Sequence, residues 1–518
     1  MRLVGGTPTE PAWVYGLAGA LMLGGPMARE LYFTHYPARP EAFLLPLFAA
    51  AVGATIAIGS RFVRGLLGSV VFGGLLFAFS DLQFDPQRWT YFALVLAGCL
   101  VLAQLLVRHR AAIAALGLGA FYLTSLGRPG IAPVPTRLER TGPSRPDKPL
   151  LVHIILDEQW GVGGLRAAGD TTTAAFLSDF YLTRGFELFE SAYSRYLLSE
   201  ESLQNAMLVG DSVIDPMPRR APYRYILRRN PYFRRLRELG YTIRVYQPTF
   251  MDFCSDSVAA VASCDVRSGN SIANIGYVDG SWVERGRWVA RYFLHTRSHV
   301  HARLVPDRIS WRRSSVGGGL DALRRLATGI AADPAGGTAW FVHVLAPHRP
   351  LQLDSECRIA DLSGMVGFAV PGSPVDSLSP DALESYASQV RCTHRVLGRV
   401  IDAIDSTVGR NHSIVIVHGD HGSRLHAHDP YRPLAAYSSA ELNADFATLL
   451  AVRRPGVAST VRPEPTPFQD VMRELAESGF TGPISGSWRH YVSEAWRRDG
   501  VVVRPLALAD MPWVRQPD

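Results

Sequence analysis

Five long stretches in the first quarter of the chain are almost free of charged residues. They cover residues 13–27, 43–59, 66–80, 91–107 and 111–126. Each extends to about 20 residues when its aromatic or small flanks are counted, which is close to the length needed to cross a bilayer. None has the polar face, repeating every 3.6 residues, that helices of a soluble bundle show. The pattern therefore predicts five membrane-spanning helices, with a soluble helical bundle as the alternative.

The distribution of arginine predicts how these helices are oriented. Arginine pairs occur in the short connectors at residues 61–64 and 108–110. Short loops with excess positive charge remain on the cytoplasmic side of a membrane. The opposite loops, residues 28–41 and 81–90, are therefore predicted to lie outside, and so is everything after residue 126.

A proline-rich stretch follows the last apolar segment. Residues 127–149 contain six prolines among Arg, Gly and Ser, and such a composition favours a semi-rigid spacer over a helix or a central strand. The predicted organisation is a transmembrane region at 1–126, a linker at 127–149 and a periplasmic catalytic domain at 150–518.

Short apolar runs alternate with helical patterns in the third of these regions. The runs at residues 150–156, 340–346 and 413–417 are each followed by acidic or histidine residues. Alternation of strands and helices predicts an α/β fold with a mostly parallel sheet. Because ligands bind beyond the carboxyl ends of such strands, we expect the polar residues after the three runs to converge.

Composition and charge exclude several classes of function. The chain is 47% hydrophobic and only 19% charged, which agrees with a membrane-embedded portion. Its net charge of +7 is not gathered in one stripe, so no nucleic-acid partner is predicted. Lys148 is the only lysine, which excludes Schiff-base chemistry and a phosphate-binding loop that depends on lysine.

Four of the five cysteines follow the linker. An even number in an exported domain predicts two disulfides. The close pair Cys254 and Cys264 is the first candidate, which leaves Cys357 with Cys392. Metal binding by these four is the alternative, although no CxxC spacing occurs.

Residues that suit a divalent metal ion follow the first and third runs. Asp157, Asp420 and His421 offer oxygen and imidazole ligands for an ion such as Zn, Mn, Mg or Ca. Such an ion can activate a hydroxyl nucleophile and balance the charge of a phosphoryl or sulfuryl group.

Four motifs in this order resemble the sulfatase-like branch of the alkaline phosphatase superfamily. They are ILDE at 155–158, FESAYSRYLLSEESLQNAML at 189–208, HVLAPHRP at 343–350 and GDHGSR at 419–424, and FATLLAVRRPG at 446–456 is also similar. The resemblance implies an α/β/α domain and covers roughly residues 149–456.

The resemblance also implies roles for individual residues. Ser199 matches the nucleophile, which forms a covalent phosphoryl or sulfuryl intermediate. Glu158 stands where relatives carry an acidic ligand, so it is a fourth candidate ligand beside Asp157, Asp420 and His421.

Substrate contacts are implied for three further residues. His348 matches the substrate-binding histidine. His343 lies within an apolar run, where it is either a core histidine or a substrate contact, and Arg424 is either an anion-binding residue or part of a surface salt bridge. His426 and His428 are candidates for a second metal site, with a solvated loop as the alternative.

Departures from the family pattern narrow the expected activity. The residues after Ser199 lack the proline and arginine of formylglycine sulfatases, and the active-site lysines of those enzymes are absent. The combination of five membrane spans, an exported domain and a hydroxyl nucleophile resembles lipoteichoic acid synthase and phosphoethanolamine transferases. The nucleophile of those enzymes is normally threonine.

The sequence therefore predicts a multi-pass protein of a bacterial inner membrane that acts, through a serine-linked intermediate, on a phosphoryl-linked group of an envelope lipid or polysaccharide. A phosphodiester or sulfate-ester hydrolase without an acceptor, and a membrane scaffold with a decayed site, are the alternatives. The sequence leaves the oligomeric state open.

Overall fold

The computed structural model describes residues 10–63, 66–84, 89–126, 147–209, 217–219, 223–269, 271–304, 316–334, 336–360, 380–423, 425, 437–488 and 490–493. The chain forms two compact units. A helical unit combines Met1–Ala132 with Asn270–Ser314, and a sheet unit combines Pro133–Gly269 with Ser315–Asp518.

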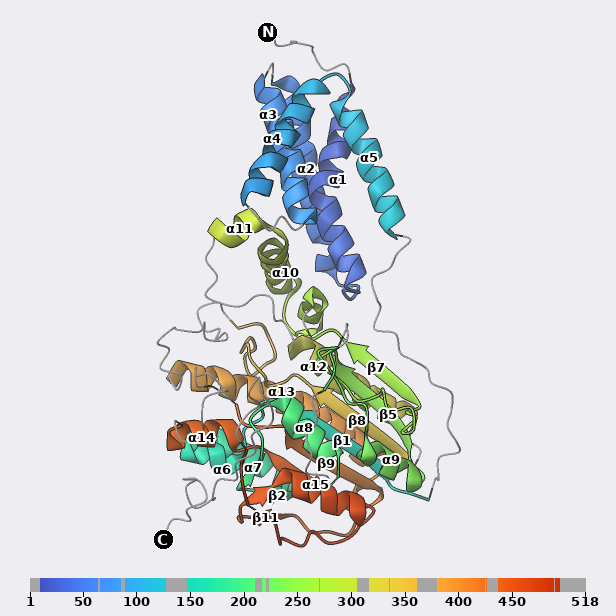
Figure 1. Ribbon diagram of the computed structural model, residues 1–518, viewed down its shortest axis with the longest axis vertical. Coiled ribbons are helices and arrows are strands. Elements are labelled where there is room, and N and C mark those ends of the chain that lie inside the picture. The colour runs from blue at the N-terminus through green and yellow to red at the C-terminus, as the bar shows by residue number, and fades with distance from the viewer. Residues whose placement is uncertain are drawn as a thin grey trace. The chain divides into compact units, whose positions relative to one another are not determined.

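Each of the five apolar stretches forms a helix in the helical unit (Figure 1). The helices are α1 (Ala12–Phe33), α2 (Pro40–Phe62), α3 (Leu66–Gln83), α4 (Trp89–Leu105) and α5 (Arg110–Leu126). Among the described residues, α2 and α3 are long and apolar enough to cross a membrane, and the apolar parts of α4 and α5 are shorter. The structure thus contains the five expected helices, of which two satisfy the length and hydropathy requirements for a span.

A segment from the second half of the chain packs against these helices. It contains a 3₁₀ helix, η1 (Ile272–Tyr277), and two α-helices, α10 (Trp282–Arg297) and α11 (His299–Leu304). We call residues 271–304 the insert. The sequence placed them in one continuous domain at 150–518, whereas their contacts place them with the apolar helices.

Buried ion pairing explains where the insert docks. The Arg285 guanidinium donates to both oxygens of Glu41, with Nε 2.6 Å from Oε1, and both side chains are buried. The Tyr36 hydroxyl donates to the same carboxylate at 3.0 Å. Because a buried carboxylate without partners is strongly destabilising, the first turn of α2 needs the insert.

The sheet unit is built on eight strands in the order β11-β2-β10-β9-β1-β8-β5-β7. Their bounds are β1 (Leu150–Leu156), β2 (Glu187–Phe189), β5 (Thr242–Pro248), β7 (Ser263–Arg267), β8 (Thr338–Val344), β9 (Ser413–Gly419), β10 (Leu450–Arg453) and β11 (Thr460–Arg462). Strands β9, β1, β8, β5 and β7 are mutually parallel, and β10 is antiparallel to β9 and β2. The predicted mixed α/β fold with a largely parallel sheet is confirmed.

Two short strand pairs stand beside the main sheet. Strand β3 (Ala192–Tyr193) pairs with β12 (Thr466–Pro467), and β4 (Tyr225–Ile226) pairs with β6 (Met251–Asp252).

Helices cover both faces of the sheet (Figure 1). On one face, α8 (Ser199–Met207), α9 (Pro231–Glu238) and α15 (Phe468–Glu477) share an apolar core with alternate sheet residues such as Ile155, Phe341 and Ile416. On the other face, α12 (Val316–Ala332) packs against Trp340 and Val344 and contacts α13 (Pro380–Thr407). The remaining helices are α6 (Val162–Ala167), α7 (Thr171–Thr183), η3 (Arg410–His412) and α14 (Ser439–Phe446). Alternate side chains of each central strand thus enter separate apolar layers.

Both predicted disulfides are present. Cys254 is bonded to Cys264, and Cys357 is bonded to Cys392. Because these four cysteines form disulfides, they do not bind a metal ion in this structure. Cys99 has a free thiol.

Candidate active site

Ser199 lies at the first position of α8, directly after the extended residue Leu198. Glu200 and Glu201 occupy the first turn, where negative side chains stabilise the positive end of the helix dipole. The Ser199 side chain is buried, and its Oγ lies 3.0 Å from His421 Nε2. The structure therefore joins the predicted nucleophile to one of the predicted metal ligands.

Strand pairing brings Asp157 and Asp420 together. Leu156 at the end of β1 pairs with Gly419 at the end of β9, so the two aspartates are the next residues on adjacent parallel strands. Ligand atoms of Asp157, Asp420 and His421 all lie within 4.8 Å of one another, and the three residues are buried. The geometry is that of a small ligand cluster, and their role as metal ligands remains a prediction.

Hydrogen bonds orient the cluster. The Nδ1 of His421 lies 2.8 Å from the carbonyl oxygen of Gly422, which only accepts, so Nδ1 carries a proton and Nε2 faces Ser199 Oγ. Asp420 Oδ1 accepts from the backbone N–H groups of Glu158 and His421. Asp420 Oδ2 is buried and lies 3.3 Å from His421 Nε2.

The pKa of Asp420 reflects two opposing effects. Burial alone would raise it, but the neighbouring His421 and the Glu158 N–H lower it below the ordinary value. The carboxylate is therefore ionised at neutral pH, as a metal ligand must be.

The residues present fit a divalent metal ion. Asp157 and Asp420 are almost fully buried, with ligand atoms within 4.8 Å of each other, and burying two carboxylates so close together is costly without a compensating cation. Two carboxylates and an imidazole nitrogen form a ligand set that suits Zn or Mn.

The Glu158 carboxylate takes a different direction from the expected one. Glu158 has a φ of 59°, in the left-handed region, and this turn separates its side chain from that of Asp157. Its Oε2 accepts from the Arg349 N–H at 3.2 Å, and its Oε1 lies 3.6 Å from His348 Nε2. Glu158 is thus outside the three-residue cluster and holds the loop after β8.

The two histidines of the loop after β8 have different environments. His348 is 19% exposed, and its Nε2 lies 4.0 Å from Asp157 Oδ1, so it can reach a bound substrate. His343 is buried, and its Nε2 lies 3.3 Å from Asp157 Oδ2. Burial lowers the pKa of His343 to about 4, so this neutral ring orients Asp157. Arg424, His426 and His428 lie outside the described residues.

The sequence reasoning missed Gln469, at the start of α15. Its side-chain amide donates to the hydroxyls of Ser194 at 3.1 Å and Ser202 at 3.2 Å. Ser202 in turn donates to the carbonyl of Asp420 at 2.5 Å. This chain of bonds ties α8, which carries Ser199, to the loop that carries Asp420.

A second group that was missed lies beneath the site. The Nε2 atoms of His153 in β1 and His418 in β9 lie 2.8 Å apart, at hydrogen-bond distance. The Tyr232 hydroxyl lies 2.9 Å from His153 Nδ1. The sequence signal for this pair is a histidine inside the apolar run at 150–156 and another directly after the run at 413–417. The ring of His418 stacks on Phe468, the residue before Gln469.

Two glycines of the GDHG motif are required by close packing. A Cβ atom on Gly422 would lie 1.9 Å from the carbonyl oxygen of Ala444, and one on Gly419 would lie 2.3 Å from Thr448 Oγ1. Either substitution would displace the loop that carries Asp420 and His421.

We expect Ser202→Ala to lower kcat roughly 10- to 100-fold, because losing an outer partner of a metal ligand costs about that much. KM should change far less, since Ser202 faces the Asp420 carbonyl rather than the solvent. Steady-state kinetics test this, with Ser178→Ala on α7 as a control that removes a hydroxyl bonded only within its own helix. Equal kcat values for the two variants would contradict the positioning role.

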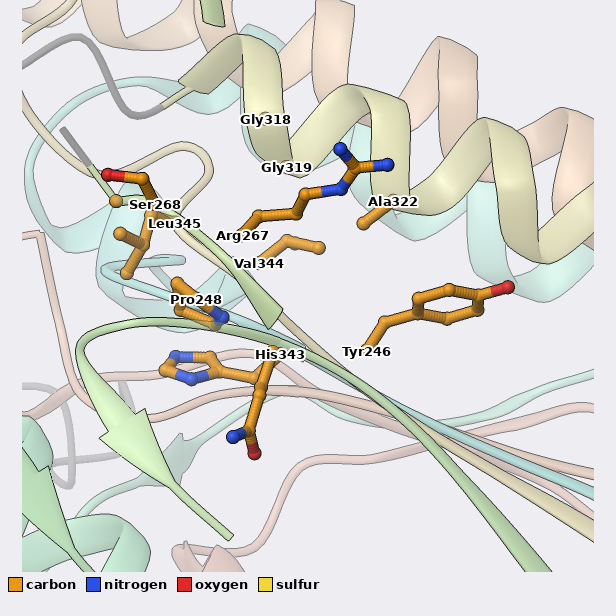
Figure 2. Close-up of a pocket in the computed structure, with 12 residues that line it drawn as sticks. Tyr246, Pro248, Arg267, Ser268, Gly318, Gly319, Ala322, His343, Val344 and Leu345 are labelled. Carbon is orange, nitrogen blue, oxygen red and sulfur yellow. The ribbon is translucent and has the colours of Figure 1, made fainter. Parts of the chain in front are cut away.

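A small pocket lies beside this site, at the carboxyl ends of β5, β7 and β8 (Figure 2). Figure 2 shows the Arg267 side chain extending toward Gly319 of α12, whereas the His343 ring points away from it. Arg267 is paired with Asp265 at 3.4 Å and Asp321 at 3.3 Å. Its positive charge is thus already compensated, and the pocket is not part of the ligand cluster.

The fold and site define an α/β domain with a buried serine at a helix N-terminus beside a candidate metal centre. No family model matches the chain, and no curated protein matches it in sequence.

Solved structures are similar to part of the chain. The C-terminal periplasmic domain of EptC from Escherichia coli is 11% identical, with 70% of this chain and 94% of that chain covered and a TM-score of 0.41. BT1596, a 2-O GAG sulfatase, is 12% identical over 66% and 72%, with a TM-score of 0.40. A protein in the alkaline phosphatase superfamily from Vibrio parahaemolyticus is 13% identical over 66% and 72%, with a TM-score of 0.33.

Proposed function

We propose that this protein is a membrane-anchored, metal-dependent hydrolase or phosphotransferase that uses Ser199 as its nucleophile. Its substrate would be a phosphoryl-linked group on an envelope lipid or polysaccharide. The observation that carries the proposal is the 3.0 Å contact between Ser199 Oγ and His421 Nε2, within a buried cluster that also contains Asp157 and Asp420.

The arrangement supplies what a serine nucleophile needs. The positive end of α8 lies at Ser199 and favours negative charge on the reacting group. A divalent ion held by Asp157, Asp420 and His421 would lower the pKa of the hydroxyl and offset substrate charge. His348, the more exposed histidine, is placed to contact the substrate or the leaving group.

The proposed reaction has two displacements. Ser199 Oγ bonds to phosphorus as the bond from phosphorus to the leaving oxygen breaks, and the serine loses a proton while the leaving oxygen gains one. Water or an acceptor hydroxyl then attacks the phosphoryl-serine and restores the Ser199 hydroxyl. Water as the attacking group makes the enzyme a hydrolase, and a glycan or lipid hydroxyl makes it a transferase.

Contacts of the insert support an external location for the sheet unit. The insert is bonded to Glu30, Glu41 and Asp81. These residues lie at helix ends within segments 28–41 and 81–90, which the arginine distribution predicts to be outside. The chain leaves the sheet unit at Gly269 and returns to it at Ser315. The proposed location is therefore an inner membrane with the catalytic unit in the periplasm, anchored by α1 to α5.

The product of a labelled substrate tests the reaction type. Full-length protein in membranes is incubated with phospholipids labelled in the phosphoryl headgroup, and we expect label to leave the lipid. Label found in a glycan or second lipid shows transfer, and label found as free headgroup shows hydrolysis. Label that stays in the donor lipid, at the same rate as with Ser199→Ala protein, would contradict the proposal for these lipids.

A further inference from the structure

The exposed face of α10 combines apolar and basic side chains. Val283 is 40% exposed and Leu294 is 36% exposed, and the exposed residues Arg287 and Arg291 lie between them on the same helix face. Leu304 at the end of α11 is 76% exposed. A helix face of valine, leucine and arginine, with Trp282 49% exposed at the start of the helix, is the composition of a helix that lies in a membrane interface.

The buried side of the insert fixes this face at one end of the apolar helices. Arg285 pairs with Glu41 in the first turn of α2, and Arg297 pairs with Glu30 near the end of α1.

A third contact completes the attachment. Ser298 Oγ donates to Asp81 Oδ2 at 2.5 Å, and the His299 N–H donates to Asp81 Oδ1 at 3.0 Å. Asp81 is close to the end of α3. Since α1 and α3 end where α2 begins, all three acidic residues mark the same end of the helices, and α10 and α11 are held there.

We infer that the exposed face of α10 binds the phosphate groups of outer-leaflet phospholipids. Arg287 and Arg291 have the charge that complements a lipid phosphate, and Val283 and Leu294 have the apolar surface that the boundary of the acyl region accepts. The inference rests on the membrane anchoring in the proposed function and adds a lipid-binding surface to it. Such a surface would hold lipid at the level of the membrane where a lipid substrate must be collected.

Depth measurements on spin-labelled protein test the position of α10. Cys99→Ser removes the free thiol, and Leu294→Cys then places a label on α10 in full-length protein reconstituted with phosphatidylethanolamine and phosphatidylglycerol. Phe48→Cys on α2, at a position 70% exposed, reports on membrane anchoring itself. Ser406→Cys on α13 is the aqueous reference.

Accessibility to oxygen and to a water-soluble nickel complex separates the outcomes. We expect the Leu294 label to be intermediate between the other two, as an interfacial position requires. If the Phe48 label is in lipid and the Leu294 label matches the aqueous reference, the inference is wrong and the anchoring stands. If the Phe48 label is aqueous, the anchoring fails and the inference fails with it.

Charge reversal tests the phosphate contact. Arg291→Glu should raise KM for a bilayer phospholipid donor roughly tenfold, because one basic residue near an anionic surface contributes about that much to binding. Its kcat, and its KM for a short water-soluble phosphodiester, should not change. Raising the salt concentration should reduce the difference.

Arg399→Glu is the matched control, since it makes the same charge change at an exposed position on α13 of the sheet unit. An unchanged lipid KM in Arg291→Glu, or an equal rise in Arg399→Glu, overturns the inference. An equal loss with both substrates also overturns it, because damage to the catalytic site would then explain the effect.

Discussion

Ser199→Ala is expected to lower kcat by at least about 10³-fold, because loss of a covalent nucleophile removes the step on which turnover depends. The Ser199 hydroxyl contacts His421 across 3.0 Å and is buried, so deleting one oxygen leaves the surrounding packing intact. The melting temperature should therefore change by no more than a few degrees. Turnover of a phosphodiester by purified protein, together with thermal unfolding, measures both.

Ser199→Thr separates the role of the hydroxyl from that of its surroundings. Threonine keeps the nucleophilic oxygen, so this variant should retain measurable activity while Ser199→Ala does not. A phosphoryl group that stays attached to protein after rapid quenching should be found in wild type and be absent in Ser199→Ala. Full activity in Ser199→Ala would assign the nucleophile elsewhere.

Convergence of Asp157 and Asp420 was predictable from sequence. Each follows an apolar run rich in β-branched residues, and parallel strands place their carboxyl ends at the same edge. The structure adds that β1 and β9 are neighbours, with Leu156 opposite Gly419. Strand order is not encoded in periodicity, so the sequence indicated a shared edge without fixing this adjacency.

The direction of Glu158 was not predictable from sequence. The resemblance made Glu158 a candidate ligand, whereas in the structure its φ is positive and its carboxylate contacts His348 and Arg349. Such a conformation depends on tertiary contacts, including the bond from the Glu158 N–H to Asp420. Local sequence carries no signal for it.

The unit to which the insert belongs was also not predictable from sequence. Residues 271–304 lie between segments of the sheet unit, so sequence order alone assigns them to that unit. Their docking depends on pairs such as Arg285 with Glu41, which are 244 positions apart. An arginine in a helix otherwise typical of a protein surface gave no indication of which acidic residue it would meet.

The residues that hold the reactive side chains in place come from more helices and strands than the reactive side chains themselves. Ser199, Asp420 and His421 come from two motifs, yet Gln469 of α15 links Ser202 to Ser194 and thereby fixes α8. Of the two serines that Gln469 contacts, Ser202 also donates to the Asp420 carbonyl. Substitutions in α15 should therefore alter catalysis without touching the substrate.

Removal of divalent metal is expected to abolish activity and to destabilise the fold. Asp157 and Asp420 are buried together, so withdrawing the compensating cation leaves like charges in a desolvated site. A ligand at 1,000 times its Kd stabilises a protein by about 4 kcal/mol, and a loss of this order should appear as a lower melting temperature in chelator. Activity should return when Zn or Mn is added back.

Asp420→Asn tests whether the effect of chelation depends on the cluster of Asp157, Asp420 and His421. The variant should be inactive with or without metal, and its melting temperature should be nearly independent of chelator because one ligand and one buried charge are both gone. Asp265→Asn is the matched control, since Asp265 is a buried acid paired with Arg267 away from the cluster, and it should respond to chelator as the wild type does. A wild-type protein that keeps full activity and an unchanged melting temperature after exhaustive chelation would show that Asp157, Asp420 and His421 hold no essential metal.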